Sequence, residues 1–81
     1  MKQNDQDIGN RIYGLRRHLS LSRPEFCHKH NISEPLMRAL ECSMIDVKPE
    51  HSQRLLKAFQ NESIVCTEEW LLKGTGTSPL P

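Results

Sequence analysis

The chain has 81 residues, enough for one small domain with a thin core, and its formal net charge of only +1 gives a weak global argument for a nucleic-acid partner. No basic leader precedes an apolar run and no apolar segment approaches the roughly 20 residues of a membrane span, so we expect a soluble, cytoplasmic protein without a membrane partner. The three cysteines are odd in number and lack CxxC spacing, so we expect reduced thiols.

The chain is expected to begin with a short arm followed by a helix. Residues 1–7 are polar and lack periodicity, which predicts a flexible N-terminal arm. From residue 8 onward an apolar residue recurs every three or four positions, at Ile8, Ile12, Leu15 and Leu19. This spacing places these side chains on one face of a helix, so the folded domain is expected to begin at residue 8.

Two helix-start patterns follow, at Ser22 and at Ser33. Each serine can accept a hydrogen bond from the free N–H groups of a first helical turn, and each is followed two residues later by a proline, whose missing N–H does little harm there. A glutamate three residues after Ser22 completes a capping box. We predict two short helices, over 22–30 and 33–42, joined by a tight turn at Asn31.

The remaining sequence predicts two more helices and a tail. Residues 43–48 form a loop, and Pro49 opens a helix that extends to residue 60. Thr67 caps a short helix that stops at a glycine, and residues 74–81 are a linker-like tail. The expected fold is therefore all-α, with five helices, no strand and a domain over 8–73.

Charge is distributed unevenly along the chain. Residues 11–30 contain five basic residues and one acid, whereas residues 31–50 contain four acids and two basic residues. The first region can attract phosphate groups, which supply affinity and register without sequence information. The helix predicted over 33–42, by contrast, starts with an acid.

These residues together resemble the Cro/CI (phage repressor-like) helix-turn-helix family over about residues 8–76. The matching positions are Ile8-Gly9, Arg11-Ile12, Leu15-Arg16, Leu19, Leu21-Ser22, Glu25-Phe26, Ile32-Ser33, Met37 and Leu40-Glu41. A second match, to the last helix of lambdoid repressor domains, is Glu69-Trp70-Leu71-Leu72-Lys73-Gly74-Thr75. The resemblance implies a compact five-helix domain of the lambda repressor-like helix-turn-helix fold.

The resemblance also implies a mode of binding to double-stranded DNA. The helix over 33–42 enters the major groove, and the helix before it crosses the backbone. Arg23 corresponds to a phosphate-contacting residue, and Lys48 is in reach of a phosphate from its loop. The residues that would face base edges or the nearby backbone are Ser33, Glu34, Pro35, Arg38 and Ala39. Arg16 and Glu41 match a partly buried ion pair that ties the first helix to the third.

The chain departs from the family pattern where base contacts are expected. Relatives often have Gln, Ser, Asn or Arg at the positions of Glu34 and Pro35. Glutamate can accept a hydrogen bond from cytosine N4 but is repelled by phosphate, whereas Ala39 can contact a thymine methyl group. Arg38 is the only strong donor on this helix. Two glycines usual in the family are replaced, by Asn31 in the turn and by Ser43 after the third helix.

Other chemistries have less support. Cys27, His28 and His30 are close in sequence, but zinc takes four ligands and Cys27 suits a small core position, so we expect no metal. Cys27 and His28 point in different directions on a helix, so we expect no nucleophilic site, enzyme activity, cofactor or small-molecule substrate. The last helix has more large apolar residues than one inward face needs, and we expect a two-fold interface formed by Trp70, Leu71 and Leu72.

The expected function is that of a homodimeric, sequence-specific transcriptional regulator, a repressor of phage or mobile-element type that binds an inverted-repeat operator. The main alternative is a protein-interaction module on the same fold that has lost its DNA contacts, and the acidic, proline-containing start of the third helix favours it. A third possibility is the DNA-binding half of a longer regulator, with residues 74–81 as an interdomain linker. The operator, any inducer and the sign of regulation do not follow from these patterns.

Overall fold

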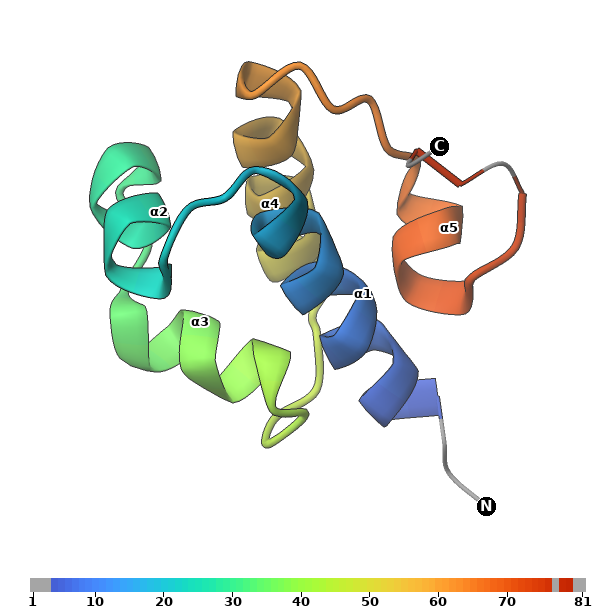
Figure 1. The fold of residues 1–81 in the computed structure, drawn as a ribbon. Helices are drawn as coiled ribbons and strands as arrows, with labels where there is room; N and C mark the ends of the chain where they lie inside the picture. The colour runs from blue at the N-terminus through green and yellow to red at the C-terminus, as the bar shows by residue number, and fades with distance from the viewer. Residues whose placement is uncertain (1–3, 77, 80–81) are drawn as a thin grey trace.

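The computed structural model describes residues 4–76 and 78–79, and over these residues it consists of helices and connecting turns without a strand. The helices are α1 (Asn4–His18), α2 (Arg23–His30), α3 (Glu34–Glu41), α4 (Pro49–Asn61) and α5 (Glu68–Lys73). The all-α class and the five predicted helices are thus confirmed for the described part of the chain. Figure 1 shows α2 and α3 on one side of α1 and α4, and α5 on the other side. None of these helices combines the length and the apolar character that a membrane crossing requires.

The first helix begins earlier than predicted. The backbone is helical from Asn4, so residues 4–7 belong to α1 and not to an arm, and residues 1–3 lie outside the described residues. Apolar periodicity detects only the part of a helix that packs on a core, and it therefore misses a polar turn that extends beyond the core. The periodic part of α1 is buried as expected, with Ile12 and Leu15 fully inaccessible.

Side-chain caps fix the starts of α2 and α3, as the sequence predicts. The N–H of Glu25 donates to Ser22 Oγ at 3.2 Å, and the N–H of Ser22 donates to Glu25 Oε1 at 2.9 Å. At α3, the N–H of Leu36 donates to Ser33 Oγ at 3.3 Å. Between the helices Asn31 adopts the left-handed conformation, with φ 55° and ψ 48°. Two capped helices therefore follow one another across a single tight turn.

The end of α3 approaches the start of α1 closely at Gly9. A Cβ atom on Gly9 would lie 2.5 Å from the carbonyl oxygen of Glu41 and 2.6 Å from Ser43 Oγ, so this contact requires a glycine. Ser43 itself has a left-handed backbone with φ 58°, at the position where the family pattern has glycine. The C-terminal end of α3 is thereby held directly against α1.

One apolar cluster joins all five helices. The rings of Phe26 in α2 and Phe59 in α4 lie 5.2 Å apart between centroids. The buried side chains of the cluster are Ile8, Ile12, Leu15, Phe26, Cys27, Ile32, Met37, Leu40, Leu55, Ala58, Phe59, Ile64 and Leu71. Because this core fixes α3 against α1 and α2, the outer side of α3 is presented as a defined surface.

The apolar residues of α5 divide between the core and its edge. Leu71 is fully buried within the chain, which makes it a core residue and corrects its assignment to the two-fold interface. Successive residues of a helix are about 100° apart, so when the middle residue of this run faces the core, its two neighbours point toward the edges. Trp70 and Leu72 are half-buried and pack against the core from outside. Arg11 of α1 secures the helix, since its Nε donates to the carbonyl oxygen of Leu71 at 2.9 Å.

Candidate nucleic-acid interface

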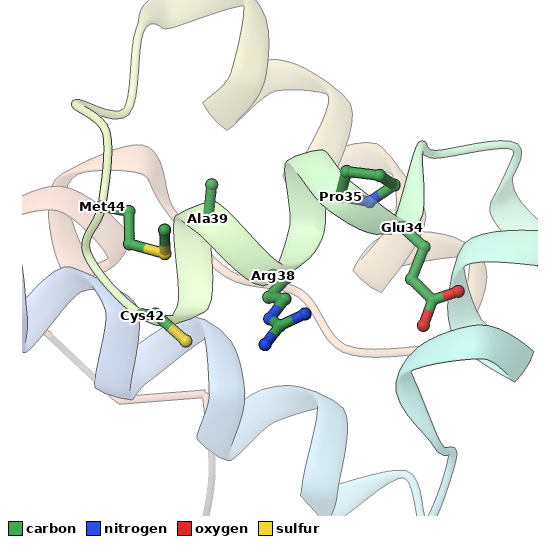
Figure 2. Close-up of a pocket in the computed structure, with 6 residues that line it drawn as sticks. All are labelled: Glu34, Pro35, Arg38, Ala39, Cys42 and Met44. Carbon is green, nitrogen blue, oxygen red and sulfur yellow. The ribbon is translucent and has the colours of Figure 1, made fainter.

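The outer side of α3 presents the residues that the sequence predicted to face DNA. Glu34, Pro35 and Arg38 are exposed, and Ala39 is half-buried. Figure 2 shows that the side chains of Glu34 and Arg38 point to one side of α3, whereas Pro35 and Ala39 lie on the other. One edge of this surface is therefore charged and the other edge is apolar.

A hollow of about 470 Å³ lies over this surface. It is lined by Glu34, Pro35, Arg38, Ala39, Cys42 and Met44 (Figure 2). The first four are predicted DNA-facing residues, but no such role was predicted for Cys42 or Met44. Met44 is 69% exposed, an unusual position for a large apolar side chain. The pattern that points to it is a pair of apolar residues, Met44-Ile45, inside a predicted loop with no helical face to bury them.

Ser33 and Lys48 are separate from this hollow. The hydroxyl group of Ser33 accepts the hydrogen bond that caps α3, so its role in the structure is to start the helix. Lys48 is exposed at the end of the loop, directly before α4, and its backbone N–H donates to His51 Nδ1 at 3.2 Å. Of the predicted DNA-facing residues, the hollow thus brings together those on α3 itself.

Glu41 forms the predicted ion pair with Arg16. Arg16 Nε lies 2.6 Å from Glu41 Oε2, and Arg16 Nη2 donates to Glu41 Oε1 at 3.0 Å. A third donor, Arg16 Nη1, bonds the carbonyl oxygen of Leu21 at 2.9 Å. The hydrogen bonds to Glu41 raise the pKa of Arg16 above its ordinary value, against the opposing effect of burial. This bidentate pair ties α1 to the end of α3.

The same carboxylate also holds Arg23, which the sequence assigned to a phosphate contact. Arg23 Nη2 and Nε lie 3.2 and 3.3 Å from Glu41 Oε1. The side chain of Arg23 remains 27% exposed, while that of Glu41 is only 2% exposed. Two guanidinium groups and one carboxylate leave a net charge of +1 at this point, so Arg23 keeps an accessible positive charge although it has a protein partner.

A basic hollow of about 630 Å³ adjoins this ion pair at the start of α2. Its charged members are Arg16, Arg17 and Arg23, and the rest of its lining is Tyr13, Ser20, Leu21 and Ser22. Arg17 Nη1 donates to the hydroxyl oxygen of Tyr13 at 2.6 Å, and its guanidinium carbon lies 5.5 Å from the ring centroid. From the sequence, Arg17 was counted only among the basic residues of the region 11–30. Its contact with Tyr13, one helical turn earlier, was not predicted, because tyrosine is uncharged and does not mark an ion pair in the sequence.

The segment with neighbouring cysteine and histidine residues has a structural role. Cys27 is buried, and burial raises the pKa of its thiol. His30 Nε2 lies 2.7 Å and Lys29 Nζ 2.8 Å from Glu62 Oε2, which joins the end of α2 to the end of α4. Within residues 4–76 and 78–79, no group of three or more His, Cys, Asp or Glu side chains is arranged to hold a metal ion.

Comparison with known proteins adds no relative. No family model, curated protein or solved structure matches the chain. The resemblance to the Cro/CI family therefore rests on the residues that carry it, and the function must be argued from the surface of α3 and the basic hollow beside it.

Proposed function

We propose that the chain is a sequence-specific DNA-binding regulator in which α2 and α3 form a helix-turn-helix unit and α3 enters the major groove. The observation that carries this proposal is the outer surface of α3, where the exposed Arg38 lies one turn before Glu41, the residue that holds Arg16 and Arg23. A donor for base edges and a basic hollow for phosphates therefore border one another. Base contacts specify a sequence and phosphate contacts supply affinity, so one duplex can engage both.

The local geometry of α2 and α3 supports a helix-turn-helix assignment. Both helices are eight residues long, both have serine caps, and Asn31 makes the turn between them in a left-handed conformation. The core on their inner side leaves the outer side of α3 exposed along its length. In a helix-turn-helix unit the second helix contacts the bases while the first crosses the backbone.

A homodimer is part of this proposal. One domain offers one α3 surface with a single strong donor, Arg38, whereas two domains related by a two-fold axis offer two such surfaces to an inverted repeat, about one helical turn apart. Trp70 and Leu72 are half-buried at the edge of the core, so a partner domain can cover the remainder of both side chains. We propose a repressor, in keeping with the family that the sequence resembles.

A selection of bound duplexes from random DNA tests the proposal. The purified chain is expected to enrich one inverted repeat, and Arg38→Ala is expected to weaken binding to that repeat by about 1–3 kcal/mol. Arg54→Ala is the matched control, because it removes the same charge from an exposed site in a different hollow, beside Lys29 and Asn31. No enrichment at low salt contradicts the proposal.

A protein-interaction module is the second candidate. The observation that favours it is the lining of the α3 hollow, in which Pro35, Ala39, Cys42 and Met44 outnumber the two charged residues. A protein partner would cover this apolar surface without any phosphate contact. Under this function Arg38→Ala and Arg54→Ala would affect DNA binding equally, and no duplex would be enriched.

A further inference from the structure

The hollow on α3 contains an apolar strip, which we define as Pro35, Ala39 and Met44. Pro35 and Ala39 are one helical turn apart on the same side of α3, and Met44 lies beyond the end of the helix (Figure 2). Cys42 lies on the side of Glu34 and Arg38 (Figure 2). Pro35, Cys42 and Met44 are exposed. The charged residues of the hollow, Glu34 and Arg38, border the strip and are not part of it.

The apolar side chains of the strip match the major-groove edge of one base better than the edges of the other three. In the major groove adenine, guanine and cytosine present hydrogen-bond donors and acceptors, whereas thymine also presents a C5 methyl group. A strip formed by a proline ring, a methyl group and a thioether offers no strong donor or acceptor. Polar base edges buried against it would lose their water without gaining a partner, while a methyl group would gain apolar contact.

The charges around the strip favour DNA as its occupant. Arg38 borders the strip on α3, and Arg17 and Arg23 line the basic hollow next to the Glu41 ion pair. Glu34 also borders the strip, but these arginines outnumber it. An apolar surface with mainly positive charges around it is complementary to a groove in which methyl groups lie between two phosphate backbones. A purely apolar protein partner would leave these charges without complementary groups.

We infer that the apolar strip binds the C5 methyl groups of thymines in each half-site of the operator, next to a base contacted by Arg38. The inference rests on the proposed function and adds the class of base that the α3 surface selects. Met44 extends the contact beyond the helix, so the recognised thymines include one opposite the loop that follows α3.

Replacement of thymine by deoxyuridine in the selected duplex tests this inference, because only the methyl group is removed. At a contacted thymine, we expect the dissociation constant to rise about fourfold for one half-site and about fifteenfold for both. In the Met44→Gln variant the thymine and deoxyuridine duplexes should bind alike at the position that Met44 contacts. Val65→Gln is the matched control, since Val65 is 79% exposed and lies on the connection before α5.

The outcomes distinguish the two levels of the proposal. If the chain prefers its selected duplex to a scrambled one, but deoxyuridine changes nothing at any position, the apolar strip does not contact methyl groups and DNA binding stands. Half-sites without thymine also overturn the inference. If no duplex is preferred at all, the proposed function fails and the inference fails with it. The deoxyuridine duplexes leave the protein unchanged, so loss of folding cannot imitate the expected result.

Discussion

Loss of the Glu41 carboxylate is expected to destabilise the domain strongly. Glu41→Ala leaves the Arg16 guanidinium, whose side chain is 6% exposed, with the Leu21 carbonyl oxygen at 2.9 Å in place of a full charge partner. Removal of one member of a buried ion pair costs about 3–5 kcal/mol, since the other charge stays buried without compensation. A domain of 81 residues has a stability of about 4–12 kcal/mol, so this variant should lose a large part of it.

The two arginines are expected to matter less than the glutamate. In Arg16→Ala the buried Glu41 keeps Arg23 at 3.2 Å, so the cost should be about 1–3 kcal/mol, that of an incompletely paired buried group. In Arg23→Ala the carboxylate keeps Arg16, and the lost contact is partly exposed, so the cost should stay below about 1 kcal/mol. The expected order of destabilisation is therefore Glu41, Arg16, Arg23.

Urea unfolding followed by far-UV circular dichroism measures these differences. The single variants and the Arg16→Ala/Glu41→Ala double variant form a cycle whose coupling energy should be about 1–3 kcal/mol. Glu50→Ala is the control for loss of a carboxylate, because the Glu50 side chain is 79% exposed, and it should change stability by less than about 0.5 kcal/mol. A coupling energy near zero, or a larger loss from Arg23→Ala than from Glu41→Ala, would refute the reasoning.

Three other predictions concern separate contacts. Arg23→Ala should weaken binding to every duplex alike. In titrations at several salt concentrations, it should lower the slope of log binding constant against log salt concentration by about 2 units for a dimer. An unchanged slope would show that Arg23 does not contact the DNA phosphates. The pKa of Glu62 is lowered in the folded state, first by its hydrogen bond to Lys29. The ionised carboxylate therefore stabilises the fold above the pKa of an unfolded glutamate, about 4.3, and this stabilisation is lost as the pH falls through the lower pKa of the folded state. Glu62→Gln should therefore flatten the acid side of a plot of stability against pH, and an unaltered acid limb would contradict this. Leu71→Ala should lower the free energy of unfolding by about 2–5 kcal/mol. Trp70→Ala should lower it less and should shift the sedimentation of the protein toward the monomer. Equal effects of the two substitutions would contradict the different burial of the two residues.

The helix starts and the turn could be predicted because a few neighbouring residues determine them. Ser22 and Glu25 form a capping box whose spacing alone fixes both hydrogen bonds. Asn31 adopts the left-handed conformation that its short polar side chain tolerates, and α2 starts one residue after the predicted capping serine. The surface of α3 followed from the same local frame, since a correct helix start and period determine which of its residues face outward.

The contacts between distant segments could not be derived from such patterns. Arg23 was assigned to phosphate from its position, yet it binds Glu41, 18 residues away in the sequence. Leu71 is a core residue because α5 packs with this side chain against helices distant in the sequence, and Arg11, 60 residues away, donates to its carbonyl oxygen. Met44 joined the hollow only through the path of the loop after α3. The pairing of Arg16 with Glu41 was predicted, but from the family resemblance and not from the physical chemistry of the two residues.

The position of the Glu41 ion pair links the stability of the domain to the geometry of the proposed interface. Apolar residues of similar volume often replace a buried ion pair without loss of stability, so stability alone does not explain such a pair in a small domain. Its hydrogen bonds are directional, and they connect α1, the start of α2 and the end of α3. Under the proposed function the α3 surface and the basic hollow must contact one duplex at the same time, bases with the first and phosphates with the second. The apolar core already fixes α3 against α1 and α2, and the ion pair adds directional bonds at the end of α3 that lies next to the basic hollow. Arg38 is thereby held in a fixed relation to this hollow, and this fixed relation is what simultaneous contact requires.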